Sequence, residues 1–198
     1  IFRKAEIRPL TRPDGRADLS VRTQDSWTLN LQLSVGTEGG ESFFTYGVTE
    51  NNILGYGKSV GAVHSQSGQA VTNDFRYSDD RFWGTRFRLS PFYTRRNQGD
   101  SLGADLIRPF FSLDTPQAGG VSWARTIGET SLQEDGQESS KFLQRSRTAS
   151  ASYWRRLPHE SLFVQRLEAG WYSQREEFTA TSQTLPQTLP AGRELSGP

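Results

Sequence analysis

The sequence has 198 residues and a net charge of +1, so its length fits one all-β domain and its charge gives no overall field for nucleic acid. Only 33% of the residues are hydrophobic, and no run of about 18 apolar residues exists, which excludes a helical membrane protein. The absence of cysteine excludes a disulfide scaffold, a zinc–thiolate site and a thiol nucleophile. A membrane β-barrel stays open, because its lumen and loops are polar.

The first 25 residues predict a polar β-hairpin. Two short runs, Ile1–Leu10 and Ala17–Thr23, flank Pro13-Asp14-Gly15, which has the residue types of a tight turn. The many charged side chains in these runs suit water and not a lipid-facing wall.

The segment Trp27–Gly36 predicts a strand with one apolar and one polar face. Successive side chains in a strand point to opposite sides of the sheet. The apolar face carries Trp27, Leu29, Leu31, Leu33 and Val35, and the polar face carries Thr28, Asn30, Gln32, Ser34 and Gly36.

The remaining segments predict an all-β antiparallel meander of about nine strands. After the first strand, we expect strands near residues 41–49, 58–66, 70–78, 85–95, 101–110, 120–128, 141–156 and 161–178. We expect a polar loop from Gly128 to Ser140 and a loop or linker over 179–198.

Strand length and charge placement favour lipid as the neighbour of the apolar faces. Many of these strands have the roughly 9–11 residues that a tilted strand needs to cross a bilayer, whereas soluble strands average about 5–6. The charged residues within them fall mostly on the polar face, as a watery lumen requires. They are Asp74, Arg76, Arg86, Arg88 and Asp105, with Arg125 as an exception. A soluble β-sandwich with one solvated face remains the alternative.

The turn after the second strand of the meander resembles the Omp85 superfamily, the BamA/TamA-type outer-membrane assembly barrels. The first inner turn of that family reads Asn, two apolar residues, Gly, any residue, Gly. This chain has Asn52, Ile53, Leu54, Gly55, Tyr56 and Gly57. Asn and Gly tolerate left-handed backbone, and we expect the apolar pair to pack under the barrel rim. The segments 26–29, 77–84 and 108–114 resemble the first barrel strand and the next two inner turns of the family.

The resemblance implies a partial transmembrane β-barrel in the bacterial outer membrane. Residues 1–25 would end a POTRA-like periplasmic domain, and residues 26–178 would form the N-terminal part of the barrel. The implied role is insertion or translocation of outer-membrane proteins, without enzymatic chemistry or a cofactor. Its partners would be outer-membrane lipids, client proteins and accessory assembly proteins, with no nucleic acid. The implied gate strand, which pairs with a client, comprises Thr28, Leu29, Asn30, Leu31, Gln32 and Leu33.

Two features of the family are missing from the sequence. The Val-Arg-Gly-Phe/Tyr motif of the inward-folded loop and the C-terminal strand with its terminal aromatic residue are both absent. About nine crossings from the periplasm would end outside the cell, and an odd number cannot close a bacterial barrel. We therefore expect the chain to be the N-terminal part of a longer protein. A pore, or an anchor for another domain, remains an alternative function.

Several other motifs do not predict a catalytic or metal site. Gly55-Tyr56-Gly57-Lys58-Ser59 looks like the end of a phosphate-binding P-loop, but that loop needs a glycine at position 52 and a following helix. His64 and His159 lie far apart, with no carboxylate cluster at ligand spacing. A basic stretch contains Arg145, Arg147, Arg155 and Arg156. We expect its side chains to face the lumen, with nucleic acid or lipopolysaccharide head groups as alternative partners.

Overall fold

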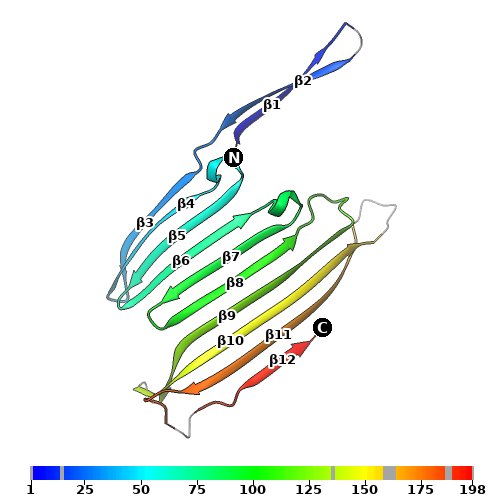
Figure 1. Cartoon of the computed structure of the whole chain (residues 1–198). Coiled ribbons are helices and arrows are strands. Elements are labelled where there is room, and N and C mark those ends of the chain that lie inside the picture. Colours follow the sequence, from blue (N-terminus) through cyan, green and yellow to red (C-terminus); the bar gives the residue numbers. More distant parts are fainter. Residues whose placement is uncertain (1, 14–15, 135–136, 158–163, 186–188, 198) are drawn as a thin grey trace.

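Ten antiparallel strands form one continuous sheet, and a separate two-stranded hairpin precedes it (Figure 1). The computed structural model describes residues 2–13, 16–134, 137–157, 164–185 and 189–197. The hairpin pairs β1 (Phe2–Thr11) with β2 (Ala17–Asp25), as the sequence predicts. In Figure 1 it projects away from the end of the sheet at which β3 begins.

Each strand of the sheet pairs with its neighbours in sequence, which confirms the predicted meander. The strands are β3 (Leu29–Glu38), β4 (Glu41–Glu50), β5 (Lys58–Ser67), β6 (Ala70–Asp79), β7 (Arg88–Arg96), β8 (Gly99–Arg108), β9 (Gln117–Glu134), β10 (Gln137–Arg156), β11 (Arg166–Ala180) and β12 (Arg193–Gly197). Two 3₁₀ turns, η1 (Ile53–Gly55) and η2 (Phe82–Gly84), connect β4 to β5 and β6 to β7.

Two predicted loops are wrong. The segment from Gly128 to Ser140 is mostly strand, because β9 continues to Glu134 and β10 begins at Gln137. The segment 179–198 contains β12, which pairs with β11 from Tyr172↔Gly197 to Glu176↔Arg193. The sheet therefore has ten strands among the described residues. The expectation that the chain ends outside the cell relied on nine strands, and this odd number is wrong.

The two edges of the sheet are β3 and β12, and they do not pair with each other in the described structure. The start of the predicted last strand, at 161–163, lies outside the described residues.

Candidate functional site: a polar inner face, an apolar outer belt and a first strand at the edge

The sheet buries polar side chains and exposes apolar ones. Among the described residues, the buried hydrophobic side chains are Ala118 and Phe142. The buried polar or charged residues are Asp79, Thr94, Ser101, Thr115, Ser140 and Glu176. This distribution is the reverse of a soluble domain, in which aliphatic and aromatic residues fill the interior.

Most exposed apolar side chains of the sheet lie on one face, because the strand register places them opposite one another, whereas Ile107, Tyr172 and Leu195 lie on the other face. Leu31 pairs with Val48, Val48 with Ala62, and Ala62 with Phe75. We call this surface the outer apolar belt, and its members are 42% to 78% exposed. They are Leu31, Leu33, Val35, Phe44, Tyr46, Val48, Val60, Phe75, Leu102, Val121, Trp123, Tyr153, Leu167 and Trp171.

The outer apolar belt runs obliquely to the rows of paired residues. The row that contains Val48 on β4 reaches Arg175 on β11. On β11, the belt residues Leu167 and Trp171 lie eight and four residues from Arg175, an average of about six. Both lie on the side of Arg175 that faces the end of the sheet with η1 and η2. At about 3.3 Å per residue and 4.8 Å per strand, this drift corresponds to strands tilted by roughly 30° against the belt. Membrane barrels tilt their strands by about 35–45°.

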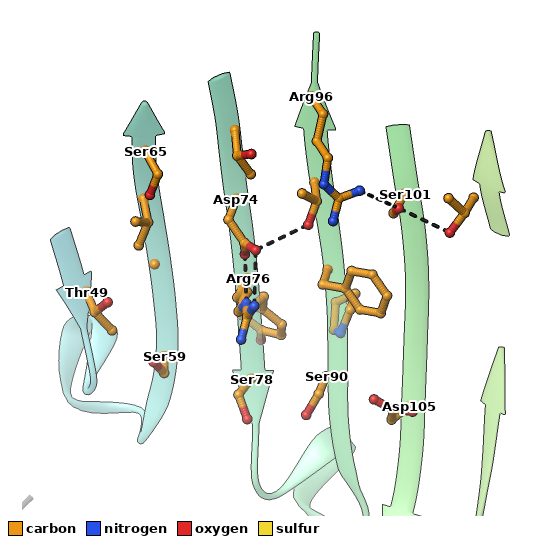
Figure 2. A pocket seen from close by; sticks show the side chains of 18 residues that line it. Thr49, Ser59, Ser65, Asp74, Arg76, Ser78, Ser90, Arg96, Ser101 and Asp105 are labelled. Carbon is orange, nitrogen blue, oxygen red and sulfur yellow. Dashed lines mark hydrogen bonds and ion pairs between the residues drawn. The ribbon is translucent and has the colours of Figure 1, made fainter. Parts of the chain in front are cut away.

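The opposite, inner face is polar and concave. It surrounds a cavity of about 1030 Å³ that β4 to β9 line. At its centre, Arg76 donates two hydrogen bonds to Asp74, of 2.7 and 3.0 Å, and Thr94 Oγ1 donates one of 3.2 Å. Figure 2 shows Asp74 and Arg76 on β6, with Ser90 on β7 and Asp105 on β8 on the same face. The predicted inner placement of Asp74, Arg76 and Asp105 is therefore confirmed.

A second set of inner-face contacts joins β7, β8 and β9. Arg96 Nη1 donates a 3.1 Å hydrogen bond to Ser101, whose hydroxyl lies 3.1 Å from that of Thr126 (Figure 2). Such paired polar groups leave few unsatisfied donors, so the face is suited to lie against water or a polar segment. No group of three or more potential metal ligands exists among the described residues. No described helix is long and apolar enough to cross a membrane.

The side chain of Asn52 closes the turn at η1. Its Oδ1 accepts a 2.7 Å hydrogen bond from the Gly57 N–H, and its carbonyl accepts one of 2.9 Å from the Gly55 N–H. Gly55 and Gly57 have φ values of 80° and 67°, as predicted for these glycines. Leu54 departs from expectation, because it is 87% exposed and does not pack under the rim, whereas Ile53 is half-buried. The strand β5 follows at Lys58, where a P-loop would have a helix.

The turn at η2 repeats the backbone of η1. Trp83 has φ 52° and ψ 32°, and Leu54 has φ 51° and ψ 24°. Both residues are 87% exposed, and each precedes a glycine with positive φ. The shared pattern of a polar residue, two apolar residues and glycine, as in Arg81–Gly84, is the signal by which the sequence could have shown that the two turns are equivalent.

The predicted gate strand is the edge strand β3, which begins at Leu29 and, among the described strands, pairs with β4 alone. Thr28 precedes it, and its carbonyl accepts a 3.0 Å hydrogen bond from the Asn51 N–H. Leu31 and Leu33 project from the apolar face and are 78% and 73% exposed. By the strand alternation, Asn30 and Gln32 lie on the inner face. The structure thus brings the six residues of the predicted gate strand and the η1 turn to the same corner of the sheet.

Two further predictions concern histidine and arginine. His64 stacks on Tyr46, with ring centroids 4.8 Å apart, and its Nδ1 lies 2.8 Å from Asn73 Oδ1, while His159 lies outside the described residues. The expected lumen position of the basic stretch is wrong for Arg145, Arg147 and Arg155, because Arg155 pairs with the belt residue Leu167 and the other two share its face. The register places Arg147 opposite Arg125, and both share a face with the outer apolar belt.

The chain was compared with family models, curated proteins and solved structures. No family model and no curated protein matches the sequence. Among solved structures, the chain is similar to the crystal structure of BamA from Haemophilus ducreyi lacking POTRA domains 1-3, with 14% sequence identity and a TM-score of 0.49. The match covers 89% of this chain and 42% of that chain, so this chain spans less than half the length of the structure it resembles.

Proposed function

We propose that this chain is the N-terminal part of the barrel of an Omp85-type outer-membrane protein and that the barrel assists the insertion or translocation of other outer-membrane proteins. The observation that carries the proposal is the reversed sheet, in which buried residues such as Asp79 and Thr94 are polar and the outer apolar belt is exposed. Contiguous apolar surfaces of this extent mark membrane or protein interaction sites.

Lipid explains the outer apolar belt better than a protein core does. A soluble sandwich would cover this face with a second sheet, yet the described chain places no second layer over it. The oblique course of the belt supports the same assignment. The strands of a membrane barrel are tilted, so a row of paired residues is inclined to the membrane plane, and a lipid-facing band must cross such rows obliquely.

The hairpin β1–β2 fits a periplasmic position. Ile7 pairs with Val21, and these side chains are 64% and 60% exposed, next to Leu19, which is 68% exposed. A hairpin on its own is only marginally stable in water, so this apolar face supports its assignment to a larger POTRA-like domain. In that orientation η1 and η2 lie at the periplasmic rim.

The edge strand β3 supplies the proposed activity. One side of its backbone pairs with β4, and the other side has no strand partner within the described residues. An extended client segment can add to such an edge through main-chain hydrogen bonds. Its alternate side chains then lie on the apolar and the polar face of the sheet, so a segment with matching alternation is favoured. This role requires templated pairing and no covalent chemistry.

Disulfide crosslinking tests this role directly, because the 198 residues contain no native cysteine. Full-length protein with Asn30→Cys on β3 is combined with a client barrel that carries cysteines along its last strand. We expect crosslinks at register-dependent positions. The matched control is Ser65→Cys on β5, a strand that pairs on both sides and should trap no client. Equal yields for the two variants would refute templating by β3.

A further inference from the structure

Three arginines form a row on the outer face of the sheet. Arg125 on β9 pairs in register with Arg147 on β10, which pairs with Arg175 on β11. All three side chains are exposed, and they share a face with the outer apolar belt. We call them the outer arginine row.

Carboxylates lie beside only one end of the outer arginine row, where Glu194 on β12 is the register partner of Arg175. Arg175 also forms a 3.0 Å ion pair with Glu177, but Arg125 and Arg147 form no ion pair or side-chain hydrogen bond with any described residue. Like charges directly opposite one another in a sheet are destabilising, so an external anion between Arg125 and Arg147 would stabilise the wall.

An apolar hollow lies on the same three strands. It is shallow and open, with a volume of about 510 Å³. Val121 on β9, Ala151 on β10 and Trp171 on β11 line it in one register row, with Tyr153 and Leu106 at its margin. Small side chains such as Ala151 leave room between the larger neighbours.

The distance between the row and the hollow matches the dimensions of a lipid. Arg125, Arg147 and Arg175 each lie about four residues beyond the hollow row, or roughly 13 Å along the strand. The apolar band of a membrane barrel is about 25 Å tall, so about half of it separates its centre from the headgroup level. The arginines therefore reach the headgroup level when the hollow lies within the acyl region.

We infer that β9, β10 and β11 form a binding site for one anionic membrane lipid, whose phosphate lies between Arg125 and Arg147 and whose acyl chain fills the hollow at Ala151. The inference rests on the proposed function only in that the outer apolar belt faces lipid. The two chemical requirements, a phosphate and a chain, exclude free phosphate as the occupant.

Native mass spectrometry of the full-length protein in neutral detergent tests the charge half of the site. The probe is dioleoylphosphatidylglycerol, and the control lipid is dioleoylphosphatidylcholine, which has the same chains and no net charge. The variants are the single substitution Arg147→Gln and the double substitution of Arg125→Gln together with Arg147→Gln. We expect retention of the anionic lipid to fall about fivefold for each arginine removed. The matched control is Arg96→Gln, which removes one charge from the inner face and should leave lipid retention unchanged.

A second pair of variants tests the hollow. Ala151→Phe fills it and should lower retention of phosphatidylglycerol, whereas Ala62→Phe, on β5 of the same face, should not. Excess inorganic phosphate should fail to displace the lipid. Equal retention of the two lipids by the unchanged protein, indifference to the arginine or Ala151 substitutions, or full displacement by phosphate would each overturn the inference. Crosslinking from Asn30→Cys, measured on the same preparations, separates this outcome from failure of the proposed function.

Discussion

Arginine placed at Val48 should distinguish a lipid-facing wall from a solvated one. Val48 lies on β4 in the outer apolar belt and is 42% exposed. Full burial of a valine side chain contributes roughly 1.5–3 kcal/mol to stability. If this face lay in water, Val48→Arg would remove only part of that contribution and lower the free energy of unfolding by about 1 kcal/mol. Facing the hydrocarbon of a bilayer, the same change destabilises a barrel by up to about 2–4 kcal/mol, the upper value applying at the midplane.

Two matched variants separate depth from face. Thr49→Arg adds the same group to the inner face, where Thr49 lines the polar cavity, and should change the free energy of unfolding by less than about 1 kcal/mol. Gln66→Arg adds it to the outer face at the far end of β5, in the row of Phe44, and should change stability by about 0–1 kcal/mol because the effect falls toward the interface. The measurement is urea unfolding of full-length protein in phosphatidylcholine vesicles. Equal losses at Val48 and Thr49 would refute the lipid-facing assignment.

Three further outcomes follow from the turns and the last strand. Asn52→Ala removes the hydrogen bond to the Gly57 N–H and should lower stability by about 1 kcal/mol in the same urea titration; an unchanged midpoint would show that the turn does not need this side chain. Leu54→Gly should raise stability by about 1 kcal/mol, because Leu54 has φ 51° and is 87% exposed, and a loss would mean that Leu54 packs against something outside the chain. Arg193→Gln removes the ion-pair partner, at 2.5 Å, of the buried Glu176 and should weaken the pairing of β12 with β11. We expect amide hydrogen exchange to become faster at Arg193–Gly197 and to stay unchanged in β10; equal acceleration in both strands would contradict this.

The sequence predicted most of the sheet wherever one face of a strand is apolar. The alternation at Trp27–Gly36 and the turn chemistry at Asn52–Gly57 gave the strand positions within a few residues. Prediction failed at Gly128–Ser140 because β9 and β10 continue there beyond the outer apolar belt, where few apolar side chains mark either face. It failed at Arg193–Gly197 because that short strand depends on pairing with β11, a contact that local pattern does not encode.

The candidate site was only partly accessible from the sequence. The parity of Asp74 and Arg76 was readable, but their link to Thr94 requires the register between β6 and β7. The outward position of Arg147 could have been read from its parity with Ala149 and Ala151 on the same strand. Its pairing with Arg125 could not, because the length of the β9–β10 hairpin decides which residues meet.

Strands β9 and β10 are longer than a membrane crossing requires, and this places part of them outside the membrane in the proposed orientation. These strands have 18 and 20 residues, whereas about 9–11 suffice to cross a bilayer. In the proposed orientation the excess, roughly 25 Å of paired backbone, stands clear of the membrane surface. Antibodies and bacteriophages that approach the cell would meet this ribbon first. Selection by such agents would act on its sequence separately from the constraints of lipid and lumen that hold the rest of the wall.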